Sequence, residues 1–149
     1  MSGILFSLED AIALAAQAHK NQKDKGGAPY ILHPLRVMHG MTDMHGMMTG
    51  VLHDVIEDTR FTLEGLRGKG CPEDVLNALD CLTRRPEESR YEDFIQRIID
   101  SKNHIARQVK IADIKDNMSP ERTQYLDEEN RLRLKNKYLP ALRAIQYGY

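Results

Sequence analysis

The stretch VLHDVIEDT, residues 51–59, contains the side chains on which the fold and the chemistry of this chain depend. Its four charged or titratable residues lie among Val, Leu and Ile, and they are His53, Asp54, Glu57 and Asp58. On a helix, residues three and four apart share a side, so these residues would line one face. Carboxylates and imidazoles are costly to bury unless they are paired, hydrogen-bonded or bound to a metal. The stretch is therefore either a solvated helix face or part of a metal site.

A metal site makes a demand that the stretch alone cannot meet. Adjacent residues such as His53 and Asp54 project roughly 100° apart around a helix. They can share one ion only if other segments supply further ligands. His33 precedes Pro34, which disfavours helical backbone at the preceding residue, and Asp113 lies in a second polar stretch, VKIADIKDN. Several separate segments thus offer suitable residue types.

The composition limits the classes of partner. The 149 residues carry a formal net charge of −1, so no overall positive field attracts a nucleic-acid polymer or an anionic membrane. No apolar run approaches the roughly 20 residues that span a bilayer, and the N-terminus has no signal-peptide pattern. Cys71 and Cys81 form no CxxC motif and are expected to be reduced. We expect a single cytoplasmic domain over residues 1–149. Monomeric and homo-oligomeric states both stay open.

The spacing of apolar residues predicts helices and no strands. No segment of four or more residues alternates convincingly between apolar and polar side chains. Apolar residues recur every three or four positions, and capping residues and prolines mark the helix ends. The predicted helices cover residues 8–22, a stretch beginning near 34, 43–57, two short stretches beginning near 62 and 72, 91–99, 103–117, and 128–138 with a bend or restart at Pro140.

Three blocks of the sequence together resemble a known family. AHKNQKDKGGAPYILHP (18–34), VLHDVIEDT (51–59) and VKIADIKDN (109–117) have the order and spacing seen in HD-domain hydrolases of the RelA/SpoT type. They are most similar to the stand-alone small alarmone hydrolases. The resemblance implies an all-α HD-domain bundle of about seven or eight helices with one divalent metal at its centre.

The resemblance also implies the metal ligands. The family holds its metal, usually Mn²⁺, through residues that match His33, His53, Asp54 and Asp113 of this chain. A set of nitrogen and oxygen ligands without thiolate also suits Fe²⁺ or Zn²⁺. Because ligand imidazoles must be neutral, we expect metal binding to weaken as the pH falls.

Glu57 and Asp58 match the Glu-Asp pair that the family uses around the attacking water. A carboxylate at such a position can orient water and take its proton. Each residue also has a plain alternative. Glu57 would be an ordinary surface carboxylate, and Asp58 would cap the end of its helix.

The resemblance implies four substrate-binding residues, which are Lys25, Tyr30, Lys110 and Asn117. Asn117 could instead cap a helix C-terminus, and the two lysines could be solvated surface charges. Asp24 departs from the family, because many members have a nucleobase-stacking Arg there. An Asp neither stacks on a purine nor attracts phosphate, so guanine recognition stays open. Three further arginines in predicted loops are candidates for phosphate contacts, namely Arg84, Arg85 and Arg122.

The resemblance implies metal-dependent hydrolysis of a nucleotide 3′-pyrophosphate. A (p)ppGpp-type alarmone would give GDP or GTP and pyrophosphate. Two alternatives remain. The chain could be an HD phosphohydrolase acting on another nucleotide or phosphate ester, such as an adenine alarmone or NADPH. It could also be a non-catalytic, metal-stabilised module that binds nucleotides.

Overall fold

Short polar side chains cap the N-termini of several helices. Ser7 caps α1 (Leu8–Ala18), and Asp43 caps α3 (Met44–Leu52). Asn103 caps α8 (His104–Asn117), and Asp127 caps α10 (Glu128–Tyr147). Each cap oxygen accepts a hydrogen bond from a backbone N–H in the first helical turn, which lacks a partner within the helix.

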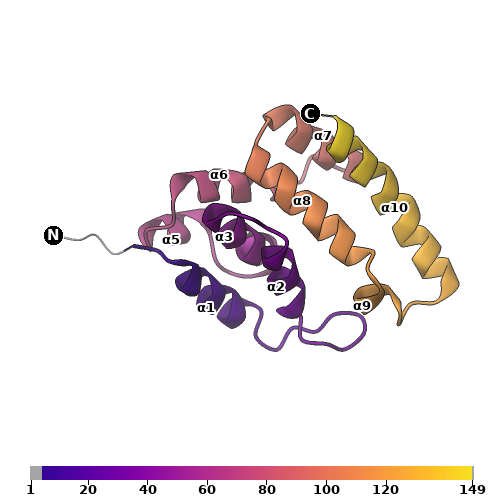
Figure 1. Ribbon diagram of the computed structural model, residues 1–149, viewed down its shortest axis with the longest axis horizontal. Coiled ribbons are helices and arrows are strands. Elements are labelled where there is room, and N and C mark those ends of the chain that lie inside the picture. Colours follow the sequence, from indigo (N-terminus) through magenta and orange to yellow (C-terminus); the bar gives the residue numbers. More distant parts are fainter. Residues whose placement is uncertain (1–4, 149) are drawn as a thin grey trace.

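The computed structural model in Figure 1 describes residues 5–148 and is helical throughout. Within that range, eight helices have six or more residues and two are single turns, which confirms the all-α prediction of seven or eight helices. Apart from the helices, the described residues contain one isolated β-bridge, between Lys23 and Pro29. The elements not yet named are α2 (Leu32–His39), α4 (Val55–Asp58), α5 (Leu63–Gly68), α6 (Glu73–Cys81), α7 (Tyr91–Ser101) and α9 (Pro120–Thr123).

Three predicted helices differ from those observed. The first ends at Ala18 rather than near residue 22, because Asn21 adopts a left-handed backbone with φ of 71°. The helix predicted over residues 43–57 is divided into α3 and α4 at His53 and Asp54. The last helix continues through Pro140. Its proline leaves the carbonyl of the exposed residue 136 without an N–H donor, and water can replace that donor.

The described residues form two apolar cores. One core joins residues of α1, α3, α5 and α6, including Leu14, Val51 and Leu76. The other joins α7, α8 and α10, including Ile98 and Ile145. In Figure 1, α8 lies between α2 and α3 on one side and α10 on the other.

Helix α2 contributes to both apolar cores. The side chain of Val37 packs in the core around α7, α8 and α10, whereas its neighbour Met38 packs in the core around α1, α3 and α6. Helix α2 therefore holds His33 at the junction between the two halves of the chain.

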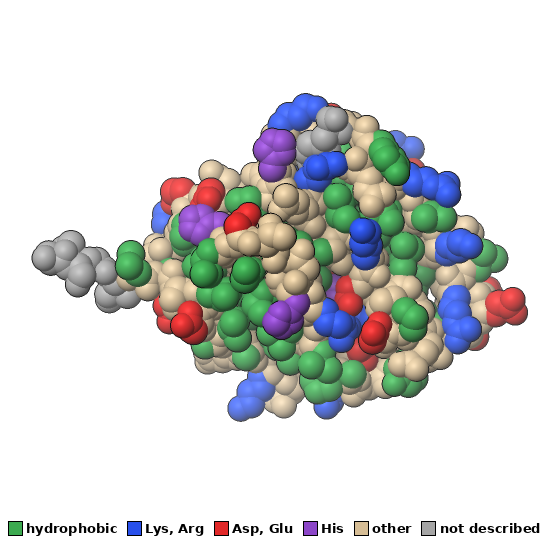
Figure 2. All heavy atoms as spheres, in the orientation of Figure 1, with side chains coloured by type: hydrophobic (Ala, Val, Ile, Leu, Met, Phe, Trp, Pro, Cys, Tyr) green, Lys and Arg blue, Asp and Glu red, His purple; other side chains and the backbone are tan. Residues whose placement is uncertain are grey.

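The surface carries charged groups of both signs. On the face shown in Figure 2, Lys and Arg side chains are interspersed with Asp and Glu, in keeping with the net charge of −1. Across residues 5–148, no helix combines the length and the apolar character needed to cross a membrane. Cys71 and Cys81 are both free thiols, as expected.

Candidate metal centre

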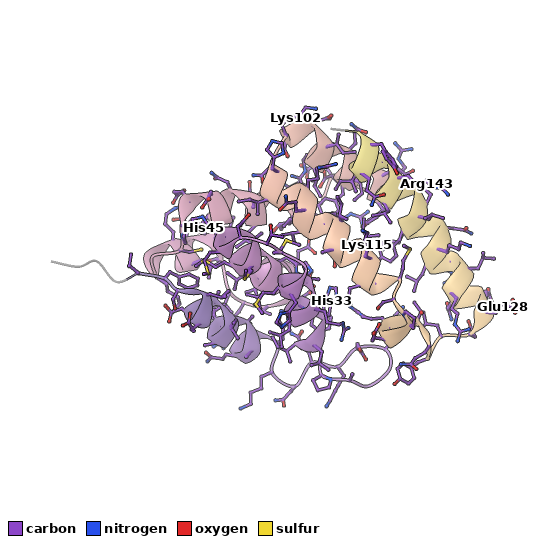
Figure 3. All side chains as sticks on the ribbon, viewed as in Figure 1. His33, His45, Lys102, Lys115, Glu128 and Arg143 are labelled. Carbon is purple, nitrogen blue, oxygen red and sulfur yellow. The ribbon has the colours of Figure 1, made fainter. Side chains whose placement is uncertain are left out.

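Four side chains from three separate parts of the chain meet at one point. Each offers one ligand atom, and these atoms all lie within 4.8 Å of one another. They belong to His33 in α2, His53 and Asp54 at the break between α3 and α4, and Asp113 in α8. In Figure 3, His33 lies at the inner side of α2 near the middle of the molecule. The convergence that the metal hypothesis requires is therefore present.

The break after α3 presents His53 and Asp54 to the same point. The His53 Nδ1 lies 2.7 Å from the carbonyl oxygen of Gly50. A carbonyl oxygen can only accept, so Nδ1 carries the proton and donates it. Nε2 is then 3.1 Å from an Asp54 oxygen and 3.2 Å from an Asp113 oxygen. A hydrogen bond to the chain's own backbone thus fixes the ring orientation that metal binding needs.

His33 is oriented by a carboxylate that sequence reasoning did not identify. Its Nδ1 lies 2.6 Å from Oδ2 of Asp116, and the guanidinium of Arg36 donates two hydrogen bonds to the same carboxylate. The His33 imidazole and the Arg36 guanidinium both lower the pKa of Asp116, although its partial burial opposes them. The ionised carboxylate accepts from Nδ1–H, so Nε2 faces Asp113 at 2.9 Å. Such outer partners fix the tautomer of metal-binding histidines.

The two ligand carboxylates are held by residues predicted to bind substrate. The Tyr30 hydroxyl donates to Asp54 Oδ2 at 2.6 Å. The Lys110 ammonium lies 2.9 Å from Asp113 Oδ2, and the Asn117 amide donates to Asp113 Oδ1 at 3.3 Å. Tyr30, Lys110 and Asn117 therefore contact the predicted ligands directly. Each retains a surface on the cavity described below.

The electrostatics of the four residues depend on mutual compensation. Burial disfavours the charged form of His53, yet Asp54 and Asp113 raise its pKa well above the usual value. Burial likewise disfavours the Asp113 carboxylate, but Lys110 and His53 hold its pKa well below the usual range. The protein thus pairs positive charge with the carboxylates of the partly buried Asp54 and the buried Asp113. A divalent cation supplies the same compensation with better-suited geometry, so the donor set fits a metal.

A cavity of about 270 Å³ lies against this cluster. His33, Asp54 and Asp113 form part of its lining, together with Glu57. Its remaining lining residues are aromatic, amide or cationic: Tyr30, Arg84, Tyr91, Phe94, Lys110, Asn117, Arg122, Lys137 and Tyr138. The cavity therefore places three of the candidate metal ligands, one additional carboxylate and several cations around the same space.

Glu57 and Asp58 occupy different positions relative to this cavity. Glu57 lines it, and its carboxylate also accepts a hydrogen bond from the backbone N–H of Arg84. Asp58 is not among the lining residues. Burial, together with the negative charges of Asp54 and Glu57, raises the pKa of Asp58 to about 6. Glu57 is thus the better placed of the two to act on a molecule in the cavity.

Asp24 has a structural role in the loop before α2. Its Oδ1 accepts hydrogen bonds of 2.9 Å from the backbone N–H groups of both Gly26 and Ala28. This pattern closes the loop locally and explains a carboxylate at this position. Lys25 lines a smaller cavity of about 100 Å³. That cavity shares Asn117, Arg122 and Tyr138 with the cavity at the metal cluster, so the two adjoin.

The three loop arginines have different environments. Arg84 lines the main cavity while donating to the backbone carbonyls of Glu88 and Ser89. Arg85 donates to the carbonyls of Asp80 and Thr83 and is not among the lining residues of the main cavity. Arg122 lines both cavities, and its buried Nη1 has no hydrogen-bond partner among the described residues.

Sequence reasoning missed the four residues Arg36, Asp116, Tyr91 and Lys137. Asp116 lies three residues after Asp113 on the same helix, a spacing that brings side chains together. The offset was therefore a usable signal for Asp116. Tyr91 and Lys137 reach the cavity only because α7 and α10 pack together, and no local pattern reports that contact.

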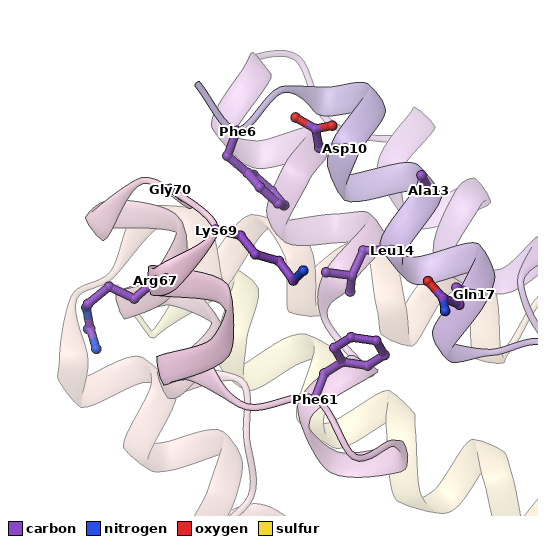
Figure 4. Close-up of a pocket in the computed structure, with 10 residues that line it drawn as sticks. Phe6, Asp10, Ala13, Leu14, Gln17, Phe61, Arg67, Lys69 and Gly70 are labelled. Atoms are coloured by element: carbon purple, nitrogen blue, oxygen red, sulfur yellow. The ribbon is translucent and has the colours of Figure 1, made fainter. Parts of the chain in front are cut away.

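A larger cavity, of about 660 Å³, lies elsewhere, between α1 and α5 (Figure 4). Its walls include Phe6, Leu14 and Phe61, and Lys69 extends across it. It contains none of the four clustered ligands. Volume alone provides no chemistry. We therefore place the candidate site at the main cavity of about 270 Å³, where candidate metal ligands and cations converge.

Comparisons with known proteins find sequence relatives of the RelA/SpoT type. No family model matches the chain. The chain is 35% identical over 116 residues to a guanosine-3′,5′-bis(diphosphate) 3′-pyrophosphohydrolase of Haemophilus influenzae. It is 37% identical over 102 residues to the bifunctional (p)ppGpp synthase/hydrolase SpoT of Escherichia coli. These alignments cover 70% and 62% of this chain, but only 17% and 14% of those relatives.

A solved structure shares the fold over nearly the whole chain. It is described as a metazoan ortholog of SpoT that hydrolyses ppGpp, and it matches with a TM-score of 0.71. The match covers 97% of this chain and 90% of that one, at 23% sequence identity. The predicted resemblance and the predicted fold are both confirmed.

Proposed function

We propose that this chain, which resembles the RelA/SpoT-type hydrolases in sequence and fold, is a metal-dependent hydrolase of a nucleotide 3′-pyrophosphate. The expected substrate is a (p)ppGpp-type alarmone, which would give GDP or GTP and pyrophosphate. The observation that carries the proposal is the convergence of His33, His53, Asp54 and Asp113 beside a cavity rich in cations. Relatives named for this reaction, and a fold neighbour described as hydrolysing ppGpp, support it.

His33, His53, Asp54 and Asp113 would hold the metal. Mn²⁺ is our first choice because of the resemblance, and the nitrogen and oxygen donors also suit Fe²⁺ or Zn²⁺. When bound, a divalent cation lowers the pKa of water and withdraws charge from a phosphoryl oxygen. Because each Nδ1 already donates to a protein oxygen, both histidines would offer Nε2 to the metal.

Glu57 is the candidate general base. Its carboxylate lines the cavity next to Asp54, where it can accept a proton from the attacking water. Lys110 and Asn117 lie on the same cavity and can contact phosphate oxygens or the sugar while they also contact Asp113. Asp58, with its pKa raised to about 6, is the candidate for passing protons to solvent near neutral pH.

A second substrate class is favoured by one observation. The Asp24 carboxylate accepts hydrogen bonds from the loop backbone, and the side chain provides no stacking surface for a guanine. The same site therefore also suits another nucleotide, such as an adenine alarmone or NADPH. Hydrolysis of such a nucleotide would use the same metal ligands and the same Glu57.

The first prediction concerns Glu57. The metal-loaded protein is incubated with ppGpp, pppGpp, ppApp and NADPH, and release of pyrophosphate and phosphate is measured. Glu57→Gln should lower kcat by about 10²–10⁴-fold, because it removes the proton acceptor, while bound metal measured by mass spectrometry stays at the parent level. Glu128→Gln, on the first turn of α10, is the matched control and should be fully active.

Two outcomes would count against the proposal. Release of product by Glu57→Gln at the parent rate would remove Glu57 from the mechanism. Absence of turnover on the whole panel, with metal bound, would favour the non-catalytic module. A clear preference for ppApp or NADPH over ppGpp would select the second substrate class.

A further inference from the structure

One wall of the main cavity carries a cation without a carboxylate partner. Lys137 of α10 lines the cavity, and its ammonium lies 4.7 Å from the ring centroid of Tyr91 and 5.0 Å from that of Tyr138. Among the residues that the structure describes, no carboxylate oxygen approaches this ammonium to within 4.0 Å. The aromatic faces attract the cation, but they leave its three hydrogen-bond donors available.

The ring beneath this lysine ends in a hydroxyl that also lacks a partner. The Tyr91 hydroxyl is buried and has no hydrogen-bond partner within residues 5–148. Burial is the main cause that raises the pKa of Tyr91, so the hydroxyl stays protonated and remains a donor at neutral pH. Buried polar groups nearly always have a hydrogen-bond partner. A buried donor left without a partner costs about 1–3 kcal/mol of stability. Such a group on a cavity wall is an opening for a ligand.

The charges around this wall repel one another. Burial is the main cause that lowers the pKa of Lys137. The positive charges of Arg84 and Lys110, which line the same cavity, lower this pKa further. Arg122 contributes a second buried donor without a partner, its Nη1. An anion bound among these groups would relieve the repulsion and accept the unused hydrogen bonds.

The two cavities suggest which part of a substrate reaches this wall. The adjoining small cavity contains Lys25 with the apolar side chains of Leu126 and Leu134, a combination suited to contact one part of the nucleoside. Tyr91 and Lys137 line the main cavity and not the small one. The wall they form is thus on the part of the site that a nucleoside in the small cavity would leave to the reacting phosphates.

We propose that Tyr91 and Lys137 bind the diphosphate that the reaction releases, with the Tyr91 hydroxyl donating to a phosphate oxygen and Lys137 supplying positive charge. This assignment rests on the proposed function, and it deepens that function by naming two residues that hold the pyrophosphoryl group, which is transferred to water as the 3′ oxygen of the nucleoside leaves. Both are substrate-binding residues, and neither takes part in proton transfer.

The test measures binding of inorganic pyrophosphate to the full chain by calorimetry, with the Mn²⁺-loaded protein and in parallel with EDTA. Lys137→Met should weaken binding about ten-fold, and Lys137→Arg should restore most of it. Lys135→Met, two residues earlier on the same helix and exposed, is the control and should bind as the parent does. The affinity for Mn²⁺ alone should be the same in all variants.

Tyr91→Phe separates a ligand-binding role from a structural one. It removes only the unpaired hydroxyl and keeps the ring beneath Lys137, so the ligand-free protein should melt at the parent temperature or higher. Pyrophosphate binding should nevertheless weaken about five-fold. Tyr147→Phe, at an 82% exposed tyrosine, is the control for loss of a hydroxyl. A lower melting temperature with unchanged pyrophosphate affinity would assign the hydroxyl to folding and overturn the proposal.

The outcomes distinguish this inference from the proposed function. Parent-like pyrophosphate affinity in both Lys137→Met and Tyr91→Phe, in a protein that hydrolyses ppGpp, would overturn this inference alone. Weakened pyrophosphate binding in both variants, in a protein that hydrolyses no nucleotide, would overturn the proposed hydrolysis and leave the diphosphate-binding wall standing.

Discussion

At the scale of single residues, the orientation of His33 depends on groups outside the ligand set. Its Nδ1 meets Asp116 at 2.6 Å, and Arg36 binds the far side of that carboxylate. Sequence reasoning proposed all four metal candidates from residue type and position and then from the resemblance, yet it missed both of these supporting residues. The three-residue offset from Asp113 was a signal for Asp116, but its contacts with His33 and Arg36 join residues 80 or more positions apart and depend on how α2 packs against α8.

The second prediction concerns this support for His33. Asp116→Asn keeps the shape of the side chain but removes the charge that fixes the histidine and neutralises Arg36. Loss of such an outer partner typically costs 10–100-fold in metal affinity. Calorimetric titration with Mn²⁺ should show a change of about that size. Asp100→Asn, at an exposed site on α7, should leave the affinity unchanged. Parent-like affinity in Asp116→Asn would show that His33 needs no such support.

At the scale of elements, the important departure from the sequence prediction is the break between α3 and α4. Apolar spacing alone favours one continuous helix over residues 43–57, because Val51, Leu52 and Val55 all belong to the apolar core. That pattern contains no information about the hydrogen bond from His53 to the Gly50 carbonyl, which forms where the helix ends. Helix existence was therefore predictable, whereas the turn that positions His53 and Asp54 was not.

The close approach of α2 and α3 depends on one glycine. A Cβ added at Gly50 would lie 3.1 Å from Cα and 3.2 Å from N of Met38, both backbone atoms of α2. The absence of a side chain at Gly50 thus allows the helix that carries His33 to approach the helix that ends in His53.

The third prediction follows from this approach. Gly50→Ala should destabilise the protein by up to about 2 kcal/mol, because displacing α2 by overpacking costs about 1–3 kcal/mol and helix propensity returns only about 1 kcal/mol of this. Gly68→Ala is the matched control, since nothing lies within 4 Å of a Cβ there. That variant should be stabilised by up to about 1 kcal/mol. Thermal and urea unfolding measure both variants, and equal gains in both would refute the packing argument.

At the scale of the whole molecule, the four candidate metal ligands join the two apolar cores. His53 ends a helix that packs in the core with α1 and α6, whereas Asp113 belongs to the helix that packs with α7 and α10. The individual helices were predictable from local spacing. The cavity wall formed by Tyr91 and Lys137 was not, because it requires the packing of two helices that are far apart in the sequence.

The fourth prediction concerns metal and pH together. A metal that binds the folded chain at 100 times its Kd stabilises it by about 2.7 kcal/mol, which for this size is roughly 5–10 °C. In the metal-free protein, Asp54 and Asp113 raise the pKa of His53 against the opposing effect of burial, so a proton competes for the site. That proton's contribution to stability is present at low pH and is lost as the pH rises through the raised pKa.

The increase in melting temperature on adding Mn²⁺ should therefore grow as the pH is raised, and EDTA should abolish it. Differential scanning calorimetry at several pH values, with and without Mn²⁺, measures this dependence. His53→Ala should show little increase at any pH. A metal-induced shift that is the same at low and neutral pH would mean that no ligand proton is displaced.

The distribution of the ligands along the chain has a consequence for biosynthesis. His33, His53 and Asp54 leave the ribosome first, and Asp113 follows only after another 58 residues have been added. A nascent chain that ends before α8 holds three of the four donors but not the helix that completes the set. The full donor set for the proposed cation is thus assembled only once α8 has been translated and has docked.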